Sequence, residues 1–207
     1  MGKMIICNTY NFGNRNRFGI TFELPQDPQL YHGTWLNGGA CYWVFGRCVG
    51  EMQYSACLQD AMILLEPIQK RMSFQCEKAI FEASAEQILQ TIDTDIDHEA
   101  DGIIEENCFG SVGTFDFWMN FRISLDLDIM NESPVFLFEH DDQARLIITK
   151  LNREKEILES QSEHMINAGE VQTVLQESFD WLRVRYQQEL DLLENSKSDK
   201  QPSLSDD

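Results

Sequence analysis

Apolar and polar residues alternate with a period close to two along the first part of the chain, which predicts short β-strands. The apolar run at residues 4–7 and the alternating segment at residues 18–24 predict two strands with a polar turn between them. Further apolar segments follow between residues 41 and 54, separated by glycines at turn or bulge positions. The pattern therefore predicts a meander of short antiparallel strands.

After residue 55 the apolar residues recur every three or four positions, which predicts an amphipathic helix. Ser55 is the expected N-cap of this helix, and Pro67 lies near its end. A second, short helix is expected over residues 85–93. There Ser84 and Gln87 have the spacing of a capping box, in which each side chain accepts the backbone N–H of the other residue.

Strand-like alternation returns in the second half of the chain. Residues 115–129 alternate over an unusually long run and predict a strand. The apolar segments 134–140 and 144–151 flank a turn-like Asp-Asp-Gln sequence and predict a hairpin. Apolar residues near both ends of segment 157–166 can anchor an edge strand.

From Val171 to Leu193 apolar residues recur at helical spacing, which predicts a long C-terminal helix packed on the sheet. The tail at residues 196–207 is almost free of apolar side chains, so we expect it to be disordered. Residues 1–195 are expected to form a single domain. The predicted fold class is α+β: a curved, mostly antiparallel β-sheet packed by a few helices.

Net charge narrows the range of partners. The 207-residue chain carries 35 acidic side chains against 16 lysines and arginines, which gives a formal net charge of -19. Such a field repels phosphate backbones and anionic membranes and attracts cationic partners. We therefore expect neither nucleic acid nor a membrane as a partner, although acidity that only maintains solubility gives the same composition.

The six cysteines include no Cys-x-x-Cys pair, and the four histidines are scattered without a cysteine at a zinc-binding spacing. Buried, reduced thiols explain the cysteines most simply. The first apolar run is too short for a signal peptide, and no stretch approaches the roughly 18 apolar residues of a membrane span. We expect a cytoplasmic protein with no metal and no cofactor.

The most acidic part of the chain follows the second predicted helix. Its alternating aspartates imitate the start of a calcium loop, but His98 replaces the required glycine and Ile104 the bidentate glutamate, so calcium is not expected. Two interpretations are open: a solvated face, or a docking surface for a basic protein. The candidate contacts are Asp93, Asp95, Asp97, Glu99, Asp101, Glu105 and Glu106.

No catalytic pattern is visible in the sequence. The glycine-rich stretch at residues 33–51 lacks both phosphate-binding patterns, GxxxxGK[ST] and GxGxxG, so its glycines are interpreted as turn positions among packed aromatic residues. Paired carboxylates can nevertheless meet in space in so acidic a chain. A small acidic hydrolase and a non-catalytic adaptor are therefore retained as alternatives to a specific inhibitor.

The same glycine-rich stretch carries a Gly-x-Trp-Leu-x-Gly element, an aromatic Cys-Tyr-Trp strand, a Gly-x-x-x-Gly turn and a helix start with Leu and Asp. In these features the chain resembles the immunity protein 42 family, whose members pair with toxins of bacterial polymorphic toxin systems. The helix start departs from the family pattern because Ala56 and Cys57 precede the leucine. The residues that carry the resemblance are Gly33, Trp35, Leu36, Gly38, Cys41, Tyr42, Trp43, Gly46, Gly50, Leu58 and Asp60.

This resemblance implies a small non-enzymatic protein that binds a cognate toxin domain and neutralises it by stoichiometric occlusion. Such a partner is expected to be basic, and a nuclease is one candidate, because a nuclease needs a basic face for its own substrate. The motif residues have the character of core and turn positions, so we interpret them as structural. The acidic residues named above are the expected toxin contacts.

Overall fold

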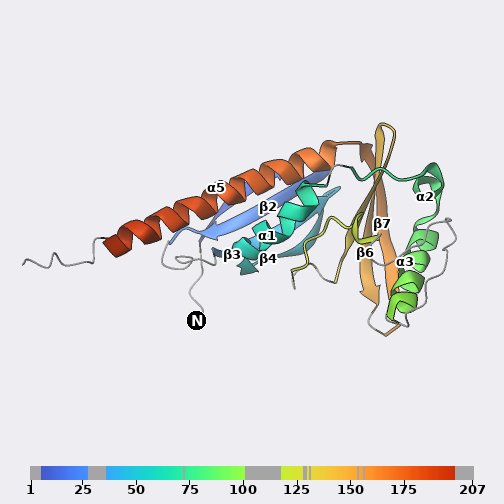
Figure 1. Cartoon of the computed structure of the whole chain (residues 1–207), viewed down its shortest axis with the longest axis horizontal. Helices are drawn as coiled ribbons and strands as arrows, with labels where there is room; N and C mark the ends of the chain where they lie inside the picture. The colour runs from blue at the N-terminus through green and yellow to red at the C-terminus, as the bar shows by residue number, and fades with distance from the viewer. Residues whose placement is uncertain are drawn as a thin grey trace, which may run out of the picture.

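The computed structural model describes residues 6–27, 36–71, 73–100, 118–127, 130, 132–152, 154–155 and 157–198; side chains are described for all of these except 51–55, 95–100 and 196–198. Within these residues the chain forms two antiparallel sheets and several helices (Figure 1). The predicted α+β class is confirmed, with the strands divided between two sheets of order β1-β2-β3-β4 and β5-β6-β7. The elements are β1 (Cys7–Gly13), β2 (Phe18–Pro25), β3 (Asn37–Val44), β4 (Arg47–Cys57), α1 (Leu58–Gln69), α2 (Lys78–Glu82), α3 (Ala85–Ala100), β5 (Val135–His140), β6 (Gln143–Asn152), β7 (Ile157–Asn167) and α5 (Glu170–Ser198).

The first sheet has one face covered by α1 and α5, which pack against each other (Figure 1). Trp181 of α5 stacks on Phe22 of β2 with ring centroids 5.6 Å apart, and it also contacts Tyr10 and Phe12 of β1. Each aromatic pair of this kind contributes about 0.5–1.5 kcal/mol beyond the area that it buries. The aromatic cluster therefore fixes the long helix on the sheet.

The second sheet is buried on both faces. Val135 and Leu137 of β5 belong to a core shared with the first sheet, whereas Phe136 and Phe138 belong to a separate cluster with α2 and α3. Figure 1 shows α3 on the outer side of this sheet, beside β7. Burial on both faces explains why β5 is a continuous apolar run instead of an alternating one.

One hydrophobic core joins the two sheets. It combines Phe18 and Tyr42 of the first sheet with Leu146 of β6 and Leu175 of α5. The Tyr42 hydroxyl lies in this core and donates a hydrogen bond to the backbone carbonyl of Ile123, at 2.9 Å. A continuous core is what a single domain requires, and the single domain expected over residues 1–195 stays a prediction.

The turn between β3 and β4 makes a second contact between the sheets. Phe45 of this turn stacks on His164 of β7, with ring centroids 4.2 Å apart and an interplanar angle of 8°. Burial lowers the pKa of His164 below its ordinary value of 6.5, and the charge of Arg47 lowers it further against the opposing effect of Glu163. The folded state therefore favours the neutral imidazole.

This contact predicts a pH dependence of stability. Above about pH 7 His164 is neutral in both the folded and the unfolded chain and contributes nothing; as the pH falls below 6.5 the unfolded chain binds the proton more readily, so stability is lost. We expect His164→Phe, which keeps a ring against Phe45, to lose less stability between about pH 7.5 and 5.5 in urea unfolding. Equal losses in the two proteins would contradict this assignment.

The first strand begins later than expected. β1 covers Cys7–Gly13, in the stretch predicted as a polar turn, while residues 4 and 5 of the expected strand at 4–7 lie outside the described residues. Tyr10 and Phe12 are the residues that β1 packs against α5, so two apolar side chains are enough for a strand whose other face is polar. The prediction of a turn over residues 8–17 is therefore wrong for residues 8–13, whereas residues 14–17 form the turn between β1 and β2.

The start of α1 also differs from the prediction. β4 continues through Ser55 to Cys57, and Cys57 is the N-cap residue of the helix. The assignment of Ser55 as N-cap is therefore wrong, because β4 continues past this position and pairs with β3 again at Ala56 and Cys57. Pro67 lies in the last turn of the helix, as expected.

The capping box of α3 is confirmed. The backbone N–H of Ser84 donates to the side chain of Gln87 at 3.0 Å, and the backbone N–H of Gln87 donates to the Ser84 hydroxyl at 3.2 Å. The helix that follows extends to Ala100, beyond the expected end at residue 93. The acidic residues immediately after 93 are therefore helical.

The strand predicted over residues 115–129 is not formed in the described part, 118–127. This part makes only one isolated bridge, between Arg122 and β5. Trp118 is buried in the cluster under α3, whereas Leu125 is buried in the core shared by the two sheets. The segment crosses from one cluster to the other, so its apolar side chains do not share one face as they do in a regular strand.

The predictions for the last third of the chain are confirmed in outline. The hairpin is formed by β5 and β6, and β7 is an edge strand. The long C-terminal helix is α5, which continues to Ser198, past the expected start of the polar tail at residue 196. Residues 199–207 lie outside the described residues.

Candidate functional interface

Asp93 is the first of the predicted acidic contacts, and it is half-buried on α3 beside β7. Its carboxylate oxygens lie 3.4 Å and 3.3 Å from the backbone nitrogen of Leu158, which donates to them. This hydrogen bond gives a partner to a backbone N–H of the edge strand β7. Asp93 therefore helps to hold α3 on the second sheet, a role that the sequence did not indicate.

The other predicted acidic contacts divide into two groups. Asp95, Asp97 and Glu99 lie on the helical backbone of α3, and their side chains are not described. Asp101, Glu105 and Glu106 lie outside the described residues. The assignment of this segment as a toxin contact stays a prediction.

Two motif residues, Gly33 and Trp35, lie outside the described residues. Tyr42 faces the shared core, whereas its neighbour Trp43 is half-buried on the opposite face of the sheet. The indole N–H of Trp43 donates to the Thr21 hydroxyl at 2.9 Å, and an arginine of the β1–β2 turn lies 4.6 Å from the ring centroid. Both aromatic residues thus make specific contacts within the chain.

Four further motif residues take part in packing or turns. Gly46 and Gly50 have φ angles of 80° and 98°, in the region that favours glycine. Leu58, the first residue of α1, is fully buried. Gly38 lies so close to β2 that a Cβ atom there would be 2.2 Å from the backbone oxygen of Glu23. These four residues therefore have structural roles, in turns or in packing.

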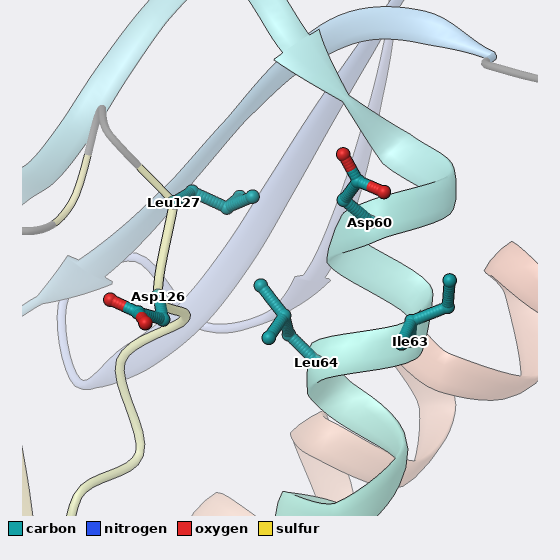
Figure 2. Close-up of a pocket in the computed structure, with 5 residues that line it drawn as sticks. All are labelled: Asp60, Ile63, Leu64, Asp126 and Leu127. Atoms are coloured by element: carbon teal, nitrogen blue, oxygen red, sulfur yellow. The ribbon is translucent and has the colours of Figure 1, made fainter.

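Asp60, the last motif residue, is exposed and lines a surface hollow of about 320 Å³ between α1 and segment 118–127. Figure 2 shows that Leu64 of α1 and Leu127 extend from opposite walls toward the space between them, while the Asp126 carboxylate points away from α1. Ile63 lies at the rim with 52% of its surface exposed. The hollow combines apolar walls with two carboxylates.

A second hollow of about 210 Å³ adjoins the first and shares Leu64 and Asp126 with it. Its lining is apolar along α1, where Pro67 contributes, and two arginines line it as well. One of them, Arg71, donates to the backbone carbonyls of residues 120 and 122 at 2.8 and 2.6 Å, so it ties segment 118–127 to the end of α1. We call the two adjoining hollows the α1 groove.

The α1 groove lacks the geometry of paired catalytic carboxylates. Asp60 and Asp126 are both exposed, and the Asp126 carboxylate is turned outward (Figure 2). Glycoside hydrolysis needs two carboxyl groups that flank one bond. Among the thiols, burial raises the pKa of Cys76 to about 11 and also raises that of Cys57, which keeps both protonated and weakly nucleophilic near neutral pH. The carboxylates of the groove and these two thiols are therefore better suited to binding than to catalysis.

Two further features bear on the type of protein. Among the described residues no group of three or more His, Cys, Asp or Glu side chains is arranged to hold a metal ion. Within the same residues, none of the helices combines the length and apolar character that a membrane crossing requires.

A family model described as immunity protein 42 matches residues 4–181 of the chain. The chain belongs to the immunity protein 42 family. It is thus a toxin immunity protein. The crystal structure of CdiI from Burkholderia dolosa AUO158 is similar to this immunity protein, with a TM-score of 0.57 and 19% sequence identity, covering 81% of this chain and 97% of that chain. At this identity the likeness shows the fold. No curated protein matches the chain significantly.

Several groove residues of this immunity protein were missed from sequence. Asp126 and Leu127 occur in the stretch predicted as a strand, and nothing in that pattern places them beside α1. A weak signal existed for Ile63, because the apolar face predicted for α1 does not include this bulky residue. An apolar residue on the polar face of an amphipathic helix can mark a contact with a partner.

Proposed function

We propose that this immunity protein neutralises a cognate basic toxin domain by binding it in a stoichiometric complex that occludes the toxin's working surface. The observation that carries the proposal is family membership combined with a formal net charge of -19. A strongly acidic protein meets a basic partner quickly and in a salt-sensitive manner. A nuclease domain fits this description, since it needs a positive surface to hold its substrate.

Occlusion requires no catalysis by the inhibitor, and we propose that this protein is not an enzyme and acts in the cytoplasm. The outward Asp126 carboxylate and the protonated thiols support a binding role over the hydrolase alternative. We further propose that acidic residues of α3 and the segment after it contact the toxin. Asp93 is a poor choice for testing that contact because it bonds to Leu158.

Survival of cells that express the neighbouring toxin domain tests the proposal. We expect this protein at comparable levels to restore growth and to co-purify with the toxin in a 1:1 ratio, because an inhibitor that occludes must be present in stoichiometric amount. A titration of purified toxin activity should end near equivalence. Full protection at a small fraction of equivalence would indicate turnover and favour the hydrolase, whereas binding without protection would favour an adaptor.

The acidic contact has a separate test. Asp95→Lys combined with Asp97→Lys should weaken toxin binding by about tenfold or more at low salt and reduce its salt dependence. Asp142→Lys combined with Asp191→Lys is the matched control, since it changes net charge equally at an exposed turn and on α5. Equal affinities of the two variants would show that the contact assignment is wrong, without affecting neutralisation itself.

A further inference from the structure

The solvent side of α1 is unusually apolar for an exposed helical face. Ile63 has 52% of its surface exposed, and Asp60 and Pro67 are exposed at helical spacing on either side of it. Leu64 is only half-buried, because the α1 groove opens between it and Leu127. Apolar side chains that gather beside a surface hollow are typical of an interaction site.

The charges of the α1 groove are unevenly distributed. Among the residues that the structure describes, the first hollow is lined by the carboxylates of Asp60 and Asp126 and by no cationic side chain. Arg122, whose side chain is 15% exposed, lies 3.5 Å from Asp126, whose side chain is 65% exposed, so water screens this ion pair from the Asp126 side. An incoming cation can therefore compete for Asp126 at little cost.

The cationic end of the groove is part of its wall. Arg71 uses its guanidinium to hold backbone carbonyls of segment 118–127, and burial lowers its pKa. The donors on its Nη1 are thus engaged within the chain, beside the second hollow with its apolar lining from Leu64 and Pro67. The groove thus combines carboxylates and apolar walls in its first hollow, next to a second hollow whose lining includes two arginines.

We infer that the α1 groove receives a segment of the basic toxin domain that carries a lysine or arginine beside an apolar side chain. The cation lies beside Asp60, the outward-facing Asp126 carboxylate adds negative charge at the rim, and the apolar side chain packs against Ile63, Leu64 and Leu127. This inference rests on the proposed function, because it names the surface that the same partner occupies. Charge complementarity supports this occupant: a second copy of the chain would bring its own net charge of -19 to an acidic groove.

A small-molecule ligand fits the groove less well than a side chain does. Ligand pockets usually measure about 300–1,000 Å³ and enclose most of the ligand. The first hollow, at about 320 Å³, is at the lower end of this range, and its rim residues Asp60 and Ile63 are exposed. These dimensions suit one or two anchoring side chains of a protein partner.

Binding of purified toxin domain to purified immunity protein variants tests the inference. Asp60→Asn combined with Asp126→Asn should raise the Kd by about tenfold or more, and Ile63→Lys by about 30-fold or more. The matched control for the second variant is Leu192→Lys, since Leu192 is 53% exposed on α5, and its Kd should stay within about twofold of wild type. Thermal unfolding establishes that each variant is folded.

The outcomes of this experiment distinguish a failure of the groove inference from a failure of the proposed function. If the wild-type protein neither binds nor neutralises the toxin domain, the proposed function fails and the groove inference fails with it. If the wild type binds and both groove variants bind equally well, only the groove inference is overturned. Should Ile63→Lys not fold, the Asn double variant decides, because it replaces two exposed carboxylates with groups of the same shape.

Discussion

Glu139→Ala is expected to lower the free energy of unfolding by about 3 kcal/mol, measured by urea unfolding at neutral pH. The Glu139 side chain is only 3% exposed and lies where β5 meets the start of α5. One carboxylate oxygen accepts the backbone N–H of Gly169 at 2.9 Å, and the other accepts the side-chain amide of Gln172 at 2.8 Å. Alanine would leave both donors unpaired and remove an anion from the positive end of a long helix.

The matched control for this prediction is Glu139→Gln, which keeps the shape of the side chain. Its amide oxygen can still accept from Gly169, and Gln172 can rotate its amide so that its oxygen, which has no partner among the described residues, accepts from the new amide. We expect a loss of about 1 kcal/mol from the missing charge. A loss as large as that of the alanine variant would show that the charge, and not the bond geometry, dominates.

Glu139 also makes a contact that could not be predicted from the sequence. The β5–β6 hairpin and α5 were predictable because apolar residues recur at the period of each element. The glutamate that joins them pairs with Gly169 across thirty positions of sequence. Such a pair leaves no local pattern, and for the same reason the division of the strands into two sheets was not foreseen.

The incorrect local predictions share a physical cause. Ser55 is a good N-cap residue by type, yet it lies within β4, which pairs with β3 on both sides of it, at Glu51 and at Ala56. The alternation around Leu125 is that of a strand, yet packing into two different clusters prevents a regular one. In both cases tertiary contacts outweigh local preference, which amounts to only about 1 kcal/mol per residue.

The candidate interface was predictable only in part. Net charge pointed to a basic partner, and the glycine-rich motif pointed to the immunity protein 42 family, to which the chain belongs. Asp60 was included for its place in the motif, and the structure adds that it is exposed at the rim of the α1 groove. Its neighbours across the groove, Asp126 and Leu127, come from a segment over sixty residues away, so only folding brings them together.

Gly38→Ala is expected to lower the free energy of unfolding by about 3 kcal/mol or more. A Cβ atom at Gly38 would lie 2.2 Å from the backbone oxygen of Glu23 and 3.0 Å from a methyl group of Leu58. The first of these atoms belongs to β2 and cannot rotate away. The strands β2 and β3 would have to separate where α1 packs on them.

Gly46→Ala is the comparison that isolates this steric effect. Gly46 has a φ of 80°, but the atom nearest to an added Cβ is a side-chain oxygen of Asn16 at 3.9 Å, so only the strained backbone angle is penalised, at about 1 kcal/mol. Urea unfolding of both variants gives the difference directly.

Toxin binding, measured at a temperature where Gly38→Ala is still folded, should equal that of wild type if the motif glycine serves the fold. A folded Gly38→Ala protein with weakened binding would instead place the toxin on this part of the sheet.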